Sequence, residues 1–374
     1  MEKVGCYIHI PFCNKKCYYC DFCAYMNMED RIDNYIKNLI REIELYQQKL
    51  CVDIDSIYIG GGTPSYIDGK YIEDIVSALE KFNINGLKEF SIECNPNSIC
   101  KDKLLLYKDL GINRISLGVQ SFDDKVLEAI GRDHTAKIAL NDIELIRNMG
   151  FDNLSFDLIL NLPKQDYKSI KKDLEIVKKI SPEHISWYSL IIEEGSRFYT
   201  LDKKGKLDLM TDEKEVEVFD EIIENLDQIG LKRYEISNFA KKGYESYHNK
   251  KYWEGEGYIA FGMSGAGFID NYRYNNTKNF IHYNDLIKED KLPRENIDYI
   301  NNEDREKEYI IFKLREISGI NLEEFESKFK VNFLDKYKDQ INQFIDQDYF
   351  IIDDSFRFTK KGMDLSNQFL SLII

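Results

Sequence analysis

Residues 13–20 read Cys-Asn-Lys-Lys-Cys-Tyr-Tyr-Cys, and this stretch decides how the chain is interpreted. It places three thiols at the spacings C-x3-C and C-x2-C, directly after the apolar run 4–12. In a long chain, cysteines clustered this tightly are typical of metal ligands or redox groups and not of a disulfide scaffold. A structural zinc site takes four ligands, so this loop leaves one position to be filled.

The composition bounds the compartment and the partners. The chain has 374 residues and a net charge of −15, so it lacks the basic field that attracts nucleic acid or an anionic membrane. No run approaches the roughly 20 apolar residues of a membrane span. The first residues lead into a strand-like run and not into a signal peptide. We therefore expect a cytoplasmic protein with no nucleic-acid partner.

Strand-like runs rich in β-branched and aromatic residues alternate with helical patterns. The expected strands are residues 4–10, 56–59, 89–93, 114–119, 153–159 and 184–190. The expected helices are residues 31–49, 70–82, 101–110, 136–149, 167–180 and 212–228. Repeated βα units of this kind predict an α/β fold with a parallel sheet, curled into a partial (β/α)6, TIM-like barrel.

The unusual residues lie at, near or just after the carboxyl ends of these strands. They are the cysteine loop, the Gly-Gly-Gly-Thr-Pro stretch 60–64, the Glu-Cys-Asn-Pro stretch 93–96, Gln120, Asp157 and Ile191. Because the carboxyl ends of parallel strands meet at one face, where such folds bind their ligands, one barrel mouth should collect all of them.

We divide the chain into three parts. Residues 1–237 form the expected barrel domain. Residues 238–298, rich in Gly, Asn, Tyr and His, are expected as a connecting segment. Residues 299–374 read as helices followed by a hairpin, which predicts a small α+β, winged-helix-like domain. That domain carries no basic recognition stripe, so we interpret it as a packing or partner domain.

The three thiols allow two kinds of centre. One is a zinc site completed by His9 or Cys23, although zinc ribbons carry two separated C-x2-C pairs and the chain has no second pair. The other is a cubane iron–sulfur cluster, in which each thiolate binds one iron. Three thiolates leave one iron open for a chelating ligand such as S-adenosylmethionine. A fourth thiolate from Cys23 would close that iron.

Motifs beyond the cysteines carry a resemblance to a known family. They are Tyr-Ile-His-Ile-Pro-Phe-Cys at 7–13, Gly-Gly-Gly-Thr-Pro-Ser at 60–65, Leu-Gly-Val-Gln-Ser-Phe at 117–122, Asp-Leu-Ile at 157–159 and Leu-Pro at 162–163. With the cysteine loop they resemble the radical S-adenosylmethionine (SAM) superfamily. Within it they resemble the HemN/HemW group of oxygen-independent coproporphyrinogen III oxidases and haem chaperones. The resemblance covers nearly the whole chain and implies a radical SAM barrel with a [4Fe–4S] cluster and SAM.

The resemblance also implies roles for individual residues. The cluster ligands would be Cys13, Cys17 and Cys20. The cofactor contacts would be Tyr7, Tyr19, Gly61, Gly62, Thr63, Glu93, Gln120, Arg132, Asp157 and Ile191. Glycine permits the close backbone approach that a bound cofactor needs, and free N–H groups can meet its carboxylate. His9 would donate a hydrogen bond behind the cluster loop.

Four features place the chain nearer the chaperone branch than the oxidase branch. Phe22 stands where the oxidase branch carries a further cysteine. The first expected strand begins almost at the first residue of this sequence, whereas the oxidase branch usually has a long segment before it. His-Asn-Lys-Lys-Tyr-Trp at 248–253 and the C-terminal stretches Phe-Thr-Lys-Lys-Gly at 358–362 and Leu-Ser-Asn at 365–367 resemble the chaperone branch.

The chaperone branch implies haem as cargo and a haem acceptor protein, soluble or membrane-associated, as partner. An electron donor would be needed if the cluster is redox active. His248 is the candidate haem ligand, with the alternative that it fixes a loop by hydrogen bonds. Radical decarboxylation of coproporphyrinogen III to protoporphyrinogen IX and a zinc-stabilised binding module remain the alternative functions.

Overall fold

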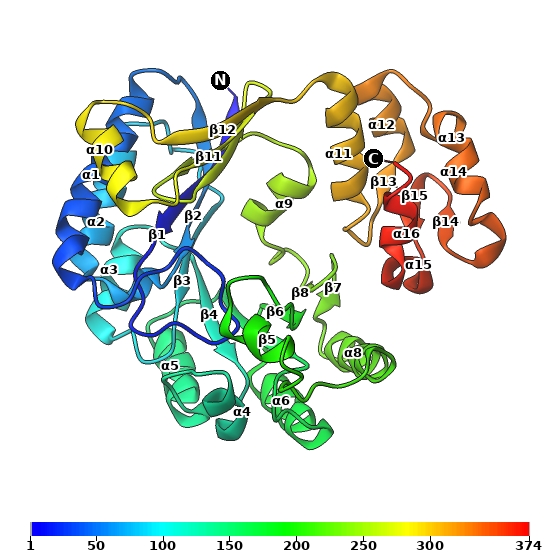
Figure 1. Ribbon diagram of the computed structural model, residues 1–374, viewed down its shortest axis with the longest axis horizontal. Helices are drawn as coiled ribbons and strands as arrows, with labels where there is room; N and C mark the ends of the chain where they lie inside the picture. Colours follow the sequence, from blue (N-terminus) through cyan, green and yellow to red (C-terminus); the bar gives the residue numbers. More distant parts are fainter. Residues whose placement is uncertain (1, 374) are drawn as a thin grey trace.

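The structure is a computed structural model and describes residues 2–373. Its chain forms a curled sheet covered by helices and a smaller C-terminal domain beside it (Figure 1). The two parts have separate apolar cores, one within the sheet and its helices and one among residues 309–373. The α/β barrel with a separate C-terminal domain that the sequence predicted is confirmed.

The sheet has 12 strands in the order β12-β11-β10-β9-β1-β2-β3-β4-β5-β6-β8-β7. Strands β1 to β6 are parallel neighbours and form the barrel wall. They are β1 Lys3–Ile10, β2 Asp53–Gly61, β3 Glu89–Cys94, β4 Arg114–Gln120, β5 Leu154–Leu160 and β6 His184–Ser189. All six lie where the sequence predicted strands, which brings their carboxyl ends to one face.

Helices cover the outside of the barrel wall (Figure 1). They are α1 Glu29–Gln47, α2 Gly69–Leu79, α3 Lys101–Asp109, α4 Asp124–Ala129, α5 Ala136–Asn148, α6 Tyr167–Ile180, α7 Arg197–Asp202 and α8 Asp212–Asp227, with the short 3-10 turn Pro64–Tyr66 after β2. Side-chain oxygens of Asp68, Thr135 and Asp166 accept hydrogen bonds from backbone N–H groups at the starts of α2, α5 and α6. These caps begin the helices where the strand-end loops finish.

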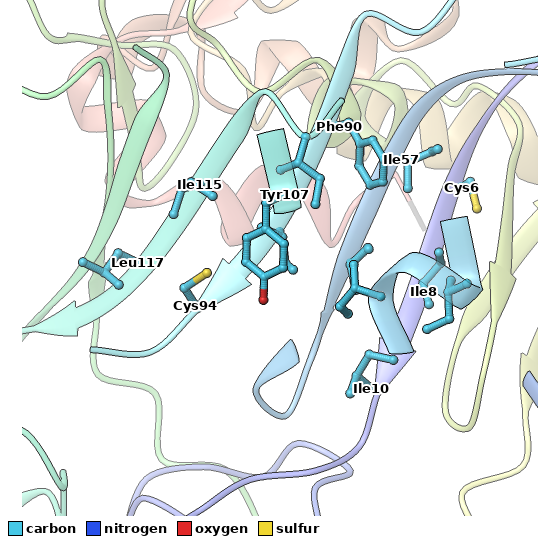
Figure 2. Close-up of a cluster of buried hydrophobic side chains, with 14 of the residues drawn as sticks. Cys6, Ile8, Ile10, Ile57, Phe90, Cys94, Tyr107, Ile115 and Leu117 are labelled. Carbon is cyan, nitrogen blue, oxygen red and sulfur yellow. The ribbon is translucent and has the colours of Figure 1, made fainter. Parts of the chain in front are cut away.

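The two faces of the barrel strands differ in chemistry. The outward residues are apolar and fully buried against the helices, as Figure 2 shows for Ile57, Phe90 and Ile115. The alternate residues face inward and line a cavity, among them Arg114, Ser116, Gly118, Gln120, Ser155, Asp157, His184 and Ser186. Period-two alternation therefore gives the barrel an apolar outer layer and a polar interior.

Residues 238–298, expected as a connecting segment, contribute strands to the same sheet. Strand β8 pairs with β6, and β9 lies parallel to β1 at the other edge of the barrel wall. The elements after α8 and before residue 300 are β7 Lys232–Arg233, β8 Asn238–Ala240, α9 Tyr247–Trp253, β9 Tyr258–Phe261, β10 Ala266–Ile269, β11 Tyr272–Asn276, α10 Phe280–Lys288 and β12 Arg294–Tyr299. The segment is therefore an integral part of the barrel.

The C-terminal domain packs helices on a three-stranded sheet of order β13-β15-β14. Its elements are α11 Asn302–Lys313, β13 Ile320–Asn321, α12 Leu322–Phe329, α13 Phe333–Lys336, α14 Lys338–Asn342, a 3-10 turn Ile345–Gln347, β14 Phe350–Ile352, β15 Ser355–Phe358, α15 Lys360–Asp364 and α16 Ser366–Leu370. Phe356 and Phe369 lie fully buried at its centre. The backbone N–H of Ile317 donates to the Tyr234 carbonyl at 3.0 Å and links this domain to the barrel.

Candidate functional site

A cavity of about 410 Å³ lies inside the barrel. It runs from the cysteine loop, at the carboxyl ends of the strands, to α9 at their amino ends. Twelve of the residues that the sequence singled out line it: Cys13, Cys17, Cys20, Tyr19, Gly61, Gly62, Thr63, Glu93, Gln120, Arg132, Asp157 and Ile191. The cofactor rim is the part of this lining beyond the cysteine loop: Tyr58, Gly61, Gly62, Thr63, Glu93, Gln120, Arg132 and Asp157.

The cysteine loop is fixed at both ends by backbone hydrogen bonds. The N–H of Cys13 donates to the Tyr25 carbonyl at 2.9 Å, and the N–H of Tyr18 donates to the Ile130 carbonyl at 3.0 Å. The Cys13 thiol lies 3.3 Å from the Thr63 hydroxyl, so the loop also contacts the segment after β2. These bonds hold all three thiols at the cavity.

His9 anchors the far side of the same loop. Its Nε2 donates to the Cys23 carbonyl at 2.8 Å, and its Nδ1 accepts from the Tyr7 hydroxyl at 3.1 Å. Burial lowers the pKa of His9 to about 4, so the ring is neutral and serves as a hydrogen-bonding spacer. The Cys23 thiol lies 3.9 Å from the Lys278 carbonyl and does not line the cavity.

Glycines 61 and 62 let the backbone approach its neighbours closely. Gly61 has a φ of +116°, and a Cβ there would lie 2.7 Å from the His9 ring. A Cβ on Gly62 would lie 2.8 Å from the Phe12 carbonyl oxygen and 3.0 Å from the Cys13 sulfur. A side chain at either position would displace the cysteine loop.

Two buried carboxyl groups face the cavity. Burial, with the negative charge of Asp157 nearby, raises the pKa of Glu93 to about 7. Burial also raises the pKa of Asp157 to about 6, against the hydrogen bond from Ser186 and two nearby arginines. Such a pair gains most from a ligand that brings positive charge.

Arg132 reaches across the rim to the cysteine loop. Its Nη1 lies 3.4 Å from the Cys17 sulfur, and its Nη2 donates to Asn95 Oδ1 at 3.0 Å and to the Gly118 carbonyl. Its buried Nε has no hydrogen-bond partner among residues 2–373. The guanidinium therefore places a positive charge beside one of the three thiols and keeps one buried donor unused.

Gln120 ends β4 in an unusual conformation. Its φ is +68°, and the pairing of β4 with β5 shifts register between Gly118 and Gln120. A bulge at the end of a strand redirects the side chain, and non-glycine residues in this region concentrate at functional sites. The side chain lines the cavity.

Tyr7 contacts the site only indirectly. It does not line the cavity, and its ring stacks on Tyr58 with the centroids 6.2 Å apart. Tyr58 does line the cavity and donates to Glu93 Oε1 at 2.9 Å. Sequence reasoning missed Tyr58, although strand alternation puts it on the same inward face as Gly60.

His248 lies in a different part of the barrel. We define the barrel floor as α9 with Asp55, Ser56 and Glu89, the strand residues that it contacts. The ring of His248 is 1% exposed, with Nδ1 2.9 Å from the Ser56 hydroxyl and Nε2 2.8 Å from the Tyr252 hydroxyl. Burial lowers its pKa to about 3. With both nitrogens engaged, the ring is not placed to coordinate iron here, which favours the loop-fixing alternative.

The floor also holds a buried ion pair and a cap for α9, while Trp253 Nε1 has no hydrogen-bond partner among residues 2–373. The Lys251 ammonium lies 2.9 Å from Asp55 Oδ1, and both side chains are almost wholly buried. Glu89 accepts from the backbone N–H of Tyr247 at 2.8 Å and from the Ser246 hydroxyl at 3.1 Å, at the start of α9. The motif at 248–253 thus closes the amino end of the barrel.

The family described as "Radical SAM superfamily" matches residues 7–177, and "HemN C-terminal domain" matches residues 300–365. "Heme chaperone HemW" of Lactococcus lactis is 35% identical over 96% of this chain and 94% of its own length. The protein of the same name from Bacillus subtilis is 36% identical over 86% of each chain.

The chain belongs to the HemW family. The fold agrees with a solved relative: Escherichia coli coproporphyrinogen III oxidase (HemN) superposes with a TM-score of 0.87 over 100% of this chain and 90% of its own, at 22% identity. Among residues 2–373 no helix combines the length and apolarity needed to cross a bilayer.

The radical SAM superfamily implies SAM and a [4Fe–4S] cluster, and the cavity fits both. Among residues 2–373, no three His, Cys, Asp or Glu side chains converge closely enough to hold a single metal ion. In a cubane each thiolate binds its own iron, so three thiols spread along one cavity wall suit the wider group. The Arg132 guanidinium beside Cys17 suits an anionic cluster, and the Glu93–Asp157 pair suits a cationic sulfonium ligand.

Proposed function

We propose that this member of the HemW family is a haem chaperone that carries a [4Fe–4S] cluster and SAM. The similarity to proteins named heme chaperone HemW along nearly the whole chain supports this function. The observation that carries it is Phe22, which stands where the oxidase branch has a further cysteine and lies 62% exposed on the cavity lining.

Cys13, Cys17 and Cys20 would hold the cluster. Gly61, Gly62 and Thr63 would meet the amino-acid end of SAM, while the Glu93–Asp157 pair would balance its positive charge. When bound and reduced, the cluster supplies an electron that can cleave the sulfonium. The protein's own task is to fix the loop, through His9 and the backbone bonds, and to keep the thiols apart from Cys23.

Haem would dock at the cavity mouth. Phe22 and Ile191 are both more than half exposed there, and Lys15 and Lys16 line the same opening. Apolar side chains can cover a porphyrin face, and ammonium groups can pair with its propionates. An acceptor protein, soluble or at a membrane, would then take the haem from this exposed position.

We also propose a reducing, cytoplasmic location. Cys13, Cys17 and Cys20 form no disulfide, and the cluster loop needs its thiols reduced. An electron donor is required only if the cluster turns over.

The test uses protein reconstituted anaerobically with iron and sulfide. Haem uptake and transfer to an apo-haemoprotein are measured for wild type, Phe22→Asp, His248→Ala and the control Ile281→Asp. Ile281 is 72% exposed on α10, away from the cavity. We expect Phe22→Asp to weaken uptake about tenfold and Ile281→Asp to leave it unchanged.

Parallel assays separate the other functions. Consumption of coproporphyrinogen III with a reductant, and release of 5′-deoxyadenosine at a useful rate, would replace the chaperone by an oxidase. Zinc in place of iron and sulfide would indicate a zinc-stabilised binding module. Loss of haem uptake in His248→Ala, with the fold intact, would return the haem site to the floor.

A further inference from the structure

The inner end of the cavity holds a positive charge that the cluster and SAM do not use. Arg114 opens β4 and lines the cavity near the barrel floor, with only 3% of its surface exposed. Ser155, His184 and Asn249 line the same end. This end lies beyond Asp157, a full strand length from the cysteine loop.

The guanidinium of Arg114 is held only by neutral acceptors. Its Nη1 donates to Asn153 Oδ1 at 3.2 Å and to the Tyr244 carbonyl at 3.1 Å. It forms no ion pair with any of residues 2–373. An arginine stays charged in proteins, and a buried charge without a partner is costly. The guanidinium is therefore left without a direct ion-pair partner.

No carboxylate among residues 2–373 makes an ion pair with Arg114. The charge of Arg114 does act on Asp157, where it opposes the rise in the pKa of that carboxyl, but the two groups are not at ion-pair distance. Glu89 is occupied by the Ser246 hydroxyl and the N–H of Tyr247 at the start of α9. His184 is bonded through Nδ1 to Ser155 at 2.8 Å and through Nε2 to Tyr234 at 2.9 Å. Burial lowers the pKa of His184 well below its ordinary value, so the ring is neutral.

The other cations on the cavity wall are committed elsewhere. Lys15 and Lys16 belong to the cysteine loop at the mouth, and Arg132 contacts Cys17. A carboxylate entering the lower cavity would thus meet Arg114, with its planar fork of donors, before any other unpaired positive group. Guanidinium and carboxylate match in shape and charge and form short, charge-assisted hydrogen bonds.

We propose that Arg114, with Ser155 and Asn249 beside it, forms a binding subsite for a small carboxylate at the inner end of the cavity. The carboxylate is either a free small acid or the acid arm of a larger molecule that reaches down the barrel. The subsite stands whether or not haem is transferred, and a porphyrin propionate is one acid arm of the right chemistry.

The test is saturation-transfer NMR with acetate on the reconstituted protein with SAM. The acetate methyl signal should receive saturation in wild type and in Arg147→Gln, which changes an arginine paired with Glu183 outside the cavity. Affinity should fall about 10- to 100-fold in Arg114→Gln and be partly kept in Arg114→Lys. Because Arg114→Gln can disturb the floor, Asn249→Leu gives a second, milder variant with the same expected direction.

The outcomes separate cleanly. Equal saturation in wild type and in folded Arg114→Gln and Asn249→Leu would overturn the subsite and leave Arg114 a structural guanidinium only. If the subsite exists, metal-free protoporphyrin added to wild type identifies the source of the carboxylate. Loss of the acetate signal assigns the site to a porphyrin propionate, and an unchanged signal assigns it to a free small acid. Soaking crystals in bromide should place an anomalous peak beside Arg114, and a lattice without one would contradict the proposal.

Discussion

The two ends of the barrel interior are both polar, yet they differ in where their charged groups find partners. At the cofactor rim, Arg132 has an unused buried donor and two carboxyls carry raised pKa values. At the barrel floor, both nitrogens of His248 are bonded and Lys251 is paired with Asp55. The charged groups of the rim face a cavity in which a bound cluster and SAM would supply partners, whereas the His248 and Lys251 contacts of the floor are made within the fold itself.

The two regions also respond differently to substitution. A change at the rim should alter ligand binding more than stability, because its groups await a partner. A change at the floor should alter stability more than ligand binding, because it leaves a buried partner unpaired. The predictions below use this contrast, from the largest expected effect to the smallest.

Replacing a cluster ligand should have the largest effect. We expect Cys17→Ser to abolish the iron–sulfur absorbance after anaerobic reconstitution, because a hydroxyl is a poor ligand for the cluster iron. Cys23→Ser is the matched control in the same loop and should keep full iron and sulfide content. Iron and sulfide assays with the visible spectrum measure both. Loss of the cluster in Cys23→Ser would mean that Cys23 is a ligand and that no iron is open.

Breaking the buried ion pair should be the next largest effect. Lys251→Met leaves Asp55 charged and unpaired in the floor, and we expect the free energy of unfolding to fall by about 3–5 kcal/mol. Denaturant titration measures this loss. SAM affinity of the folded fraction should stay within about twofold of wild type. If Lys251→Met kept the stability of the wild type but bound SAM poorly, the roles of rim and floor would be reversed.

SAM affinity should depend on pH through the rim carboxyls. The pKa values of Glu93 and Asp157 are raised to about 7 and about 6, so both groups ionise as the pH rises through this range. SAM is cationic, and we therefore expect it to bind about tenfold more weakly at pH 6 than at pH 8. Calorimetry at several pH values measures this change. In Glu93→Gln the affinity at pH 8 should drop and the dependence should flatten, and a wild-type pH profile in that variant would exclude Glu93.

The smallest effect should come from removing one hydroxyl at the rim. Tyr58→Phe deletes the 2.9 Å hydrogen bond to Glu93 and keeps the ring that stacks on Tyr7. We expect a loss of about 1 kcal/mol in SAM binding, or roughly fivefold. Tyr252→Phe, which removes the floor hydrogen bond to His248, should cost about 1 kcal/mol of stability instead. If Tyr58→Phe lowered stability and Tyr252→Phe lowered SAM affinity instead, the distinction between rim and floor would be lost.

The sequence predicts most of the rim because most of its residues lie at or after the end of a strand. The cysteine loop follows β1, and Gly61 and Glu93 lie at the ends of β2 and β3, while Asp157 lies in the middle of β5 and faces inward. Parallel strands bring their ends together. Tyr58 could be found in the same way from strand alternation, which puts it on the cavity face.

Tyr7 and His248 show where sequence reasoning stops. A motif names residue types, but it does not say whether a histidine nitrogen is already bonded or which of two stacked tyrosines faces the ligand. The sequence also does not reveal that β9 pairs with β1, because the paired residues Gly5 and Tyr258 lie far apart in the chain. Such long-range pairing leaves no local pattern in the sequence.

The most direct test of the account asks whether three thiolates leave one cluster iron open. SAM labelled with ¹⁷O in its carboxylate and ¹⁵N in its amine is added to the reduced, anaerobically reconstituted protein, and electron–nuclear double resonance is recorded. We predict hyperfine coupling of both nuclei to the cluster in wild type and in Cys23→Ser. An intact cluster that shows no coupling to either nucleus would contradict the account.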